Sequence, residues 1–216
     1  MNTLIGIYGA SGFGREVMPV ARAGFDLGET ELVFIDDNLH SQQLVNGHRL
    51  IKWVDFLAHP AAKKGVVVAI ADSALRKKLT NQITAAGVAL HSIAAPSVVI
   101  GDAVEVGAGA ILQPFVILTA NVRVGRGFHA NIYSYVAHDC VVGDFVTFAP
   151  GVMCNGNVRI EDHVYIGTGA ILRQGTPESP LVIGSGSVVG MGAVVTKSVA
   201  AGTTVVGNPA RPFEKR

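Results

Sequence analysis

The sequence predicts two domains of different architecture, a parallel α/β domain over residues 1–95 and a coil of short parallel strands over residues 96–216. Three observations lead to this prediction. Apolar, strand-like runs alternate with helix-like segments in the first part of the chain. A glycine-rich turn joins the first strand-like run to the first helix-like segment. After Pro96 the helix-like segments stop, and a six-residue repeat takes their place.

The first domain contains three strand-like runs and two helix-like segments. We expect strands at Leu4–Tyr8, Leu32–Ile35 and Val66–Ile70. We expect helices at Gly14–Ala23 and Asp72–Ala86, the second beginning on an aspartate suited to capping and followed by a glycine. Alternating strands and helices predict a parallel sheet covered by helices on both faces.

The repeat begins at Val98 and places an apolar residue at the third position of thirteen consecutive six-residue units. At random this agreement would arise about once in ten thousand sequences of the same composition. The first position is small or apolar throughout, and glycine often fills the fourth, where we expect it to ease a bend. Three such strands close a triangular coil of eighteen residues, and stacked coils share a core. The insertion Thr176–Pro180 predicts a loop that projects from one corner.

Composition and charge exclude several classes of protein. A formal net charge of +1 gives no indication of a nucleic-acid or anionic-membrane partner. The apolar block Val66–Ala71 is far shorter than the roughly 20 residues of a membrane span, and no Lys or Arg precedes the first strand as in a secretory signal. The two cysteines, Cys140 and Cys154, lie at inward repeat positions and predict small core residues. We therefore expect a cytoplasmic protein.

The turn after the first strand carries Gly9, Gly12 and Gly14. Such a turn at the start of a helix can bring backbone N–H groups against a phosphate. The spacing is not G-x-G-x-x-G, so a tight turn without a ligand remains the alternative. Asp36 and Asp37 follow the second strand, where acidic side chains can accept hydrogen bonds from a ribose or a base, the alternative being solvated turn residues. Together the two features favour a nucleotide ligand.

Three histidines, His129, His138 and His163, lie in the repeat region. They occupy different positions in their six-residue units, and zinc needs convergent ligands, so we expect no metal. His138 holds the fifth position, near a corner, and Asp139 follows it. A carboxylate beside an imidazole raises its basicity and fixes its orientation, which suits a general base. The alternatives are an exposed surface histidine, or an aspartate that meets a neighbouring subunit, because direct pairing requires a bend in the strand.

Several motifs resemble those of bacterial acyltransferases that act on nucleotide-linked amino sugars or sialic acids, the bacillosamine N-acetyltransferase and sialic acid O-acetyltransferase type. They are the repeats with YGASGFGREV, FIDD, SYVAHDC, CNGNVRIEDH and VVGNPAR. The resemblance covers essentially the whole chain. In FHANIYSYVAHDC, VTFAPG and MGAVVTKSV it is closest to the enzymes that acetylate dTDP-4-amino-4,6-dideoxyglucose (dTDP-viosamine).

The resemblance implies a Rossmann-like N-terminal domain that binds the sugar nucleotide, followed by a left-handed parallel β-helix. It also implies a homotrimer with each active site between two subunits, and acetyl-CoA as co-substrate, lying along the β-helix toward its C-terminal coils. It implies no metal cofactor.

Carried over to this chain, the resemblance assigns catalysis to His138, as the general base, and to Asp139, as the acid that tunes it. It assigns contacts with CoA to Thr147, Thr168 and Met191, the last two through backbone groups. It assigns substrate binding to Gly9, Ser11, Gly12, Phe13, Asp36, Asp37 and Ala71. Related enzymes have a histidine where this chain has Phe13 or Thr147, so we expect these two contacts to differ.

The implied function is direct transfer of acetyl from acetyl-CoA to the 4-amino group of a nucleotide-linked 4-amino-4,6-dideoxy sugar. We expect the sugar to be dTDP-linked and to serve O-antigen or other cell-surface polysaccharide biosynthesis. Backbone N–H groups would stabilise the oxyanion, with Gly143 as a candidate. One alternative is a sugar O-acetyltransferase of the sialic acid type, which needs the same base. The other is a trimeric scaffold without catalysis, which an absence of acetyl-CoA binding would favour.

Overall fold

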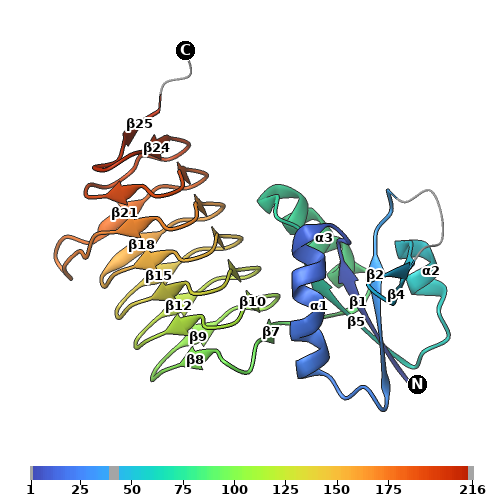
Figure 1. Ribbon diagram of the computed structural model, residues 1–216. Helices are drawn as coiled ribbons and strands as arrows, with labels where there is room; N and C mark the ends of the chain where they lie inside the picture. Colours follow the sequence, from blue (N-terminus) through green and yellow to red (C-terminus); the bar gives the residue numbers. More distant parts are fainter. Residues whose placement is uncertain (1, 39–43, 214–216) are drawn as a thin grey trace. The chain divides into compact units, whose positions relative to one another are not determined.

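The computed structural model describes residues 2–38 and 44–213, and the chain divides into two compact units, Met1–Pro96 and Ser97–Arg216 (Figure 1). The first unit contains the helices of the described chain, and the second consists of short strands and turns. No helix within the described ranges is long and apolar enough to cross a membrane.

The first unit is built around a sheet with the strand order β3-β4-β2-β1-β5-β6. Its pairings are parallel apart from that of β3 with β4, which confirms the predicted parallel arrangement. The strands are β1 (Thr3–Tyr8), β2 (Thr30–Ile35), β3 (Leu44–Val45), β4 (His48–Ile51), β5 (Lys63–Val68) and β6 (Ala89–Leu90), followed by the short β7 (Ile93–Ala94). The helices are α1 (Gly12–Gly24), α2 (Trp53–Ala58) and α3 (Ser73–Ala85).

The predicted end of β5 at Ile70 is wrong. The strand ends at Val68, because the carbonyls of Ile70 and Ala71 turn away to accept hydrogen bonds of 2.8 and 3.1 Å from Nη1 of Arg76. The prediction also missed β3, β4 and α2. These elements are short, so their side chains provide too few periods for a pattern to emerge.

The second unit is a parallel β-helix in which each coil gives one short strand to each of three faces. The first face holds β10 (Ile111–Leu112), β13 (His129–Ala130), β16 (Thr147–Phe148), β19 (Tyr165–Ile166), β22 (Val188–Val189), β24 (Thr204–Val206) and β25 (Arg211–Pro212). The second holds β8 (Val99–Ile100), β11 (Ile117–Leu118), β14 (Tyr135–Val136), β17 (Met153–Cys154), β20 (Ile171–Leu172) and β23 (Val194–Val195). The third holds β9 (Glu105–Val106), β12 (Arg123–Val124), β15 (Val141–Val142), β18 (Val158–Ile160) and β21 (Leu181–Ile183).

The six-residue repeat sets the register of these faces. Val124 pairs with Val142 and Val142 with Ile160, so equivalent residues of successive coils are stacked in columns. Third-position residues from Leu112 onward are buried in one core cluster, which also contains the free thiols of Cys140 and Cys154. Ile100, predicted to face inward, is 51% exposed because no earlier coil of the repeat covers it.

The expectation that fourth-position glycines ease the bends is wrong. The left-handed backbone conformation occurs at the sixth position, where many non-glycine residues adopt it: Ala103, Phe115, Asn121, Tyr133, Asp139, Phe145, Asn157 and His163. Fourth-position glycines serve the stacking of coils instead. A Cβ on Gly101 would lie 1.8 Å from the backbone oxygen of Thr119, and one on Gly143 would lie 2.4 Å from the Asp162 carboxylate. Only hydrogen fits at these close approaches.

The insertion Thr176–Pro180 forms a turn in which Thr176 and Ser179 exchange backbone hydrogen bonds. Val158 pairs with Leu181 across it, and the chain resumes its register at once. The insertion therefore lengthens one corner without disturbing the stack.

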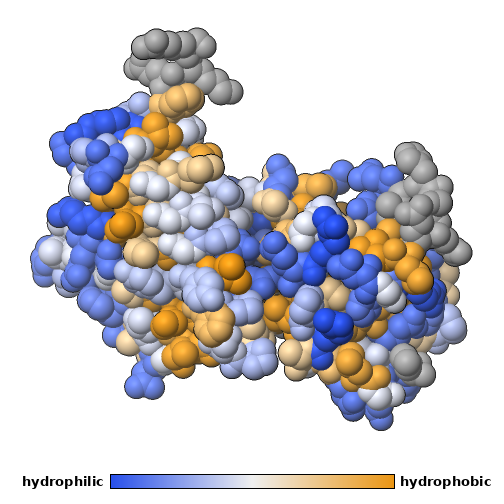
Figure 2. Space-filling model, in the orientation of Figure 1, coloured by the Kyte–Doolittle hydropathy of each residue, from blue (hydrophilic) through white to orange (hydrophobic). Residues whose placement is uncertain are grey.

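Hydrophobic side chains also reach the surface of the repeat unit (Figure 2). On the second face, the residues at the second repeat position form a continuous ladder of apolar and aromatic side chains, which we call the apolar ladder: Val99, Ile117, Tyr135, Met153, Ile171 and Val194. The equivalent column of the third face includes charged residues, among them Glu105, Arg123 and Arg159. The second face is therefore unlike the third in its chemistry.

Candidate active site

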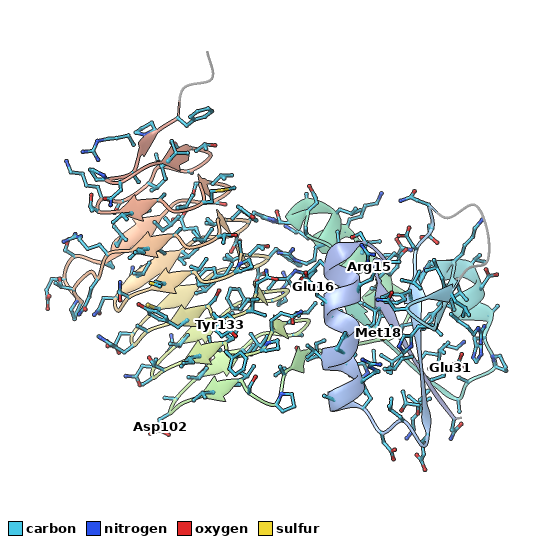
Figure 3. The ribbon with its side chains drawn as sticks, viewed as in Figure 1. Arg15, Glu16, Met18, Glu31, Asp102 and Tyr133 are labelled. Carbon is cyan, nitrogen blue, oxygen red and sulfur yellow. The ribbon has the colours of Figure 1, made fainter. Side chains whose placement is uncertain are left out.

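His138 and Asp139 lie in the turn between β14 and β15, at the corner between the second and third faces. Asp102, labelled in Figure 3, occupies the same corner two coils earlier. Both side chains of the pair are 46% exposed. The repeat therefore presents an imidazole and a carboxylate on the outside of a rigid stack.

The bend that direct pairing requires is present at Asp139, whose φ angle is 58°. It brings Oδ2 of Asp139 to 2.7 Å from Nδ1 of His138 within one chain. An ionised carboxylate can only accept a hydrogen bond, so Nδ1 carries the hydrogen and Nε2 keeps the lone pair. Nε2 is therefore the ring atom that can accept a proton.

A third side chain completes this arrangement. Nδ2 of Asn121, one coil earlier in the same column as Asp139, donates a hydrogen bond of 3.0 Å to Oδ1 of Asp139. The hydrogen bond with His138, and then the one from Asn121, lower the pKa of Asp139 below its usual value. The carboxylate therefore stays charged at neutral pH. Sequence reasoning missed Asn121, although a column spacing of eighteen residues would have pointed to it.

Gly156 lies one coil after His138 in the same column and provides space for the imidazole. A Cβ there would come within 2.5 Å of both Cε1 and Nε2 of His138. The backbone of His138 is held by a 3.0 Å hydrogen bond from Asn157 N to its carbonyl oxygen. The ring thus rests on a glycine surface that the neighbouring coil provides. Sequence reasoning missed this residue too.

Gly143 is not available as an oxyanion donor, because its N–H donates a 2.7 Å hydrogen bond to the carbonyl of Ile160. That expectation is wrong, since the fourth position of each unit takes part in the ladder between coils. Within residues 2–38 and 44–213, the N–H of Gly156 donates no backbone hydrogen bond. This amide belongs to the residue whose added Cβ would meet the His138 ring.

The glycine-rich turn of the first unit separates into two kinds of position. Gly9 has a φ angle of 107°, and a Cβ on Gly14 would lie 1.9 Å from the Gly9 carbonyl oxygen, so folding itself requires these two glycines. A Cβ on Gly12 would meet nothing within 4 Å. Ser11 precedes α1 as its N-cap residue, and its side chain makes no capping hydrogen bond. The turn from Ser11 to Phe13 therefore presents the start of a helix, where backbone N–H groups attract anions.

The acidic pair after β2 is held mainly by the protein itself. The carboxylate of Asp37 accepts hydrogen bonds from the Tyr8 hydroxyl (2.5 Å) and the Trp53 N–H (2.8 Å). The pKa of Tyr8 is raised, mainly by burial of its side chain and secondly by its hydrogen bond to Asp37. Oδ1 of Asp36 accepts from the N–H of Asn38. Asp37 therefore ties β1 and β2 to the start of α2, a structural task in addition to the predicted one.

Ala71 lies in the loop after β5, with its carbonyl bound to the guanidinium of Arg76 at 3.1 Å. Arg76 is fully buried, and burial lowers its pKa to about 10. Strands β2, β1 and β5 are neighbours in a parallel sheet, so the loops after them meet at one edge. The structure thus brings the predicted substrate-binding residues of the first unit to a common edge.

The three predicted CoA residues do not lie together. Thr147 is on β16 of the first face and only 6% exposed. Thr168 and Met191 occupy adjacent coils at the corner between the first and second faces, where Gly192 N donates to the Thr168 carbonyl at 2.8 Å. Met191 is 82% exposed. Within one chain, these two residues and His138 thus occupy different corners, on either side of the second face.

A groove of about 370 Å³ lies among the last coils of the β-helix. Its lining combines apolar residues such as Val195 and Val205 with two basic side chains, Lys197 and Arg211. In the described part of the chain, no group of three His, Cys, Asp or Glu residues could hold a metal ion. The basic groups of the groove suit a phosphorylated ligand with an apolar part.

Comparison with known proteins gives consistent similarities over the whole chain. Residues 4–83 match the family model described as the PglD N-terminal domain. The chain is 49% identical to the GDP-perosamine N-acetyltransferase of Escherichia coli O157:H7 over 215 residues, which cover 98% of this chain and 97% of that protein.

Two solved structures show the same architecture. WeeI from Acinetobacter baumannii AYE has a TM-score of 0.93 and 55% identity, with 98% of this chain and 100% of that chain covered. The acetyltransferase domain of PglB from Neisseria gonorrhoeae FA1090, in complex with acetyl coenzyme A, has a TM-score of 0.87 and 30% identity, with 99% and 100% covered. These similarities confirm the predicted fold class, a Rossmann-like domain followed by a left-handed parallel β-helix.

Proposed function

The chain belongs to the family of bacterial nucleotide-sugar N-acetyltransferases, and we propose that it acetylates the 4-amino group of a nucleotide-linked 4-amino-4,6-dideoxy sugar with His138 as general base. Acetyl-CoA is the acetyl donor. One observation carries the assignment of the base: the 2.7 Å contact between Nδ1 of His138 and Oδ2 of Asp139, which leaves Nε2 able to accept a proton.

The reaction requires a base because the attacking amine must be neutral and becomes cationic as the C–N bond forms. Nε2 of His138 removes this proton. The C–S bond of the thioester then breaks, and the departing thiolate takes the same proton from the His138 imidazolium, which restores the neutral base. The charge of Asp139 stabilises the imidazolium during the transfer. A general base of this kind contributes roughly 10² to 10⁴ in rate. Ser134 and Cys140 are buried within the β-helix, which argues against a covalent acyl-enzyme.

The carbonyl oxygen of the thioester develops negative charge in the same step. A Cβ on Gly156 would meet the His138 ring, and the Gly156 N–H makes no backbone hydrogen bond among the described residues, so we propose this N–H as the oxyanion donor in place of Gly143.

The groove near the C-terminal end of the β-helix is the proposed site for the phosphates of acetyl-CoA. Lys197 and Arg211 provide positive charge there. Thr168 and Met191 lie at the corner along which the pantetheine arm would run toward the catalytic pair. The PglB domain that resembles this chain was solved in complex with acetyl coenzyme A, which supports acetyl-CoA as the donor.

The base of the nucleotide distinguishes two candidate acceptors. The motifs favour a dTDP-linked sugar, whereas the relative from Escherichia coli is named for GDP-perosamine. Perosamine and viosamine are both 4-amino-4,6-dideoxyhexoses, so the proposed reaction is the same for either. We propose GDP-perosamine as the first acceptor to test and dTDP-viosamine as its competitor, with cell-surface polysaccharide biosynthesis as the destination of the product.

A homotrimer is the assembly that we propose for this activity. The apolar ladder of the second face is an exposed strip that a second copy of the chain could cover. This face lies between the corner of His138 and the corner of Thr168 and Met191. Association through it would bring the base of one subunit toward the CoA contacts of another, which would explain why the two lie at different corners of one chain.

The decisive experiment measures thiol release from acetyl-CoA with GDP-perosamine or dTDP-viosamine as acceptor. In His138→Asn we expect kcat to fall by roughly 10² to 10⁴. Acetyl-CoA binding measured by calorimetry, and the mass of the assembly measured by light scattering, should remain unchanged. A variant that keeps the kcat of the unaltered protein would show that His138 is not the base.

A further inference from the structure

We propose that Asn121 is a positioning residue for the transfer reaction, because its side-chain amide holds the Asp139 carboxylate in the orientation that pairs it with His138. This inference rests on the proposed role of His138 as the base. It adds a third member to the pair, one that touches neither the base nor the substrate.

The two oxygens of Asp139 have separate partners. Oδ2 contacts Nδ1 of His138 at 2.7 Å, and Oδ1 accepts the amide hydrogen bond of Asn121 at 3.0 Å. The two contacts together define the plane of the carboxylate. If the amide were absent, the carboxylate could rotate about its terminal torsion, which has a broad preference. The imidazole would then lose the partner that fixes its tautomer.

The exposure of the pair makes this support necessary. His138 and Asp139 are each 46% exposed, and a groove of about 270 Å³ on the third-face side borders Asn121 and Asp139. An exposed ion pair gains little free energy and spends side-chain entropy to keep one geometry. A second hydrogen bond to the carboxylate reduces the number of orientations that compete with the productive one.

The backbone at position 121 does not itself require asparagine. Asn121 has a φ angle of 53°, and Ala103, one coil earlier in the same column, adopts 54° with no amide side chain. The turn at Asn121 is secured by its own N–H, which donates to the Asp102 carbonyl at 3.0 Å. The corner can therefore form without the Asn121 amide. The role that remains for the amide is its hydrogen bond to the Asp139 carboxylate.

The test compares two glycine substitutions at the same corner. Asn121→Gly removes the amide and keeps a residue that favours positive φ. Asn157→Gly makes the same change two coils later in the same column, where φ is 56°, and serves as the matched control. The Asp139 carboxyl is titrated by 13C NMR in the unaltered protein and both variants. In parallel, kcat and KM are measured for acetyl-CoA and the nucleotide sugar.

We expect the Asp139 carboxyl to titrate at a higher pH in Asn121→Gly than in the unaltered protein, since a hydrogen bond that lowers its pKa is gone. We expect kcat to fall roughly 10- to 150-fold, the range for loss of a hydrogen bond to a charged group, with KM for acetyl-CoA unchanged. In Asn157→Gly the titration of Asp139 should stay in place.

The outcomes separate this inference from the proposed base. An unchanged titration of Asp139 in Asn121→Gly, or an equal shift in both variants, would overturn the role of Asn121. So would an unchanged kcat in Asn121→Gly while His138→Asn is inactive, and in that case the base assignment would stand. Full activity of His138→Asn would overturn both.

Discussion

The two units differ in what holds their functional residues. In the first unit, other parts of the protein already bind many of the groups that sequence reasoning assigned to the substrate. The carboxylate of Asp37 is engaged by Tyr8 and Trp53, and the carbonyl of Ala71 by Arg76. In this unit the internal hydrogen bonds shape the loops that we propose as the substrate site.

In the second unit, the repeat itself provides the support. His138, Asp139, Asn121 and Gly156 belong to two adjacent columns of one corner, so each is placed by the stacking of coils. Their polar atoms face outward and contact one another. Under the proposed roles, recognition would rely on loops supported by long-range contacts, and catalysis on a rigid, periodic scaffold. Changes in the first unit should therefore affect folding and recognition, and changes in the second should affect the rate of transfer.

The largest expected effect is on folding, from Gly14→Ala in the first unit. The added Cβ would lie 1.9 Å from the backbone oxygen of Gly9, which no flexible side chain can relieve. We expect the free energy of unfolding to fall by about 3 kcal/mol, at the upper end of the cost of overpacking. Urea denaturation followed by circular dichroism measures this change.

Gly12→Ala is the matched control, because a Cβ at Gly12 meets nothing within 4 Å. It should keep the stability of the unaltered protein and raise KM for the nucleotide sugar if the start of α1 faces the substrate. Equal stability of the two variants would show that the turn does not depend on the close approach at Gly14.

The next effect is on the rate, from Gly156→Ala in the second unit. A Cβ at 2.5 Å from Nε2 would displace the imidazole from its place against the coil. Small displacements of a catalytic group can cost about 10²-fold, so we expect kcat to fall roughly 10- to 100-fold. The thermal unfolding midpoint should change little, since the exposed His138 ring can move into solvent. A large loss of stability with a normal kcat in the folded fraction would contradict this account.

The difference between the two units also explains which features could be predicted from the sequence. The strands and core of the β-helix followed from the repeat, because a fixed period places the third-position side chains inside from Leu112 onward. The position of Asn121 under Asp139 was also within reach, since it needs only the eighteen-residue spacing. The left-handed corners were not, because residues as different as Ala103 and Tyr133 adopt them under the constraint of neighbouring coils.

In the first unit the limit is of another kind. The hydrogen bond from Tyr8 to Asp37 joins residues on different strands, and the burial of Arg76 depends on how α3 packs. No local sequence pattern encodes such contacts. The pair Asp36 and Asp37 therefore gave the same signal whether its carboxylates stabilise the fold or bind a ligand. The sequence could indicate the edge of the sheet where these loops lie. It could not indicate which polar groups at that edge are already hydrogen-bonded within the protein.

A smaller effect is expected at the groove among the last coils of the β-helix, the proposed site for the phosphates of acetyl-CoA. Replacing Lys197 or Arg211 by Ala removes one positive charge from an exposed groove, where salt screens the attraction to phosphates. We expect KM for acetyl-CoA to rise about 1.5- to 5-fold per substitution, with kcat unchanged, in line with the modest free energy of exposed charge pairs. The difference from the unaltered protein should shrink as ionic strength increases. A decrease in kcat at saturating acetyl-CoA would indicate a role beyond binding.

The smallest effect concerns the pH dependence of stability at the His138 corner. The pKa of Asp139 is lowered in the folded chain, so its pairing contributes stability above the ordinary carboxyl pKa, and this contribution is lost as the pH falls through the lower folded value. Asp139→Asn should therefore differ from the unaltered protein in unfolding midpoint at about pH 5, which lies above the usual aspartate pKa. The difference should vanish in stronger acid. A difference that grows on acidification would mean that the folded chain raises the pKa of this carboxyl, and the hydrogen bonds from His138 and Asn121 would then not be its main environment.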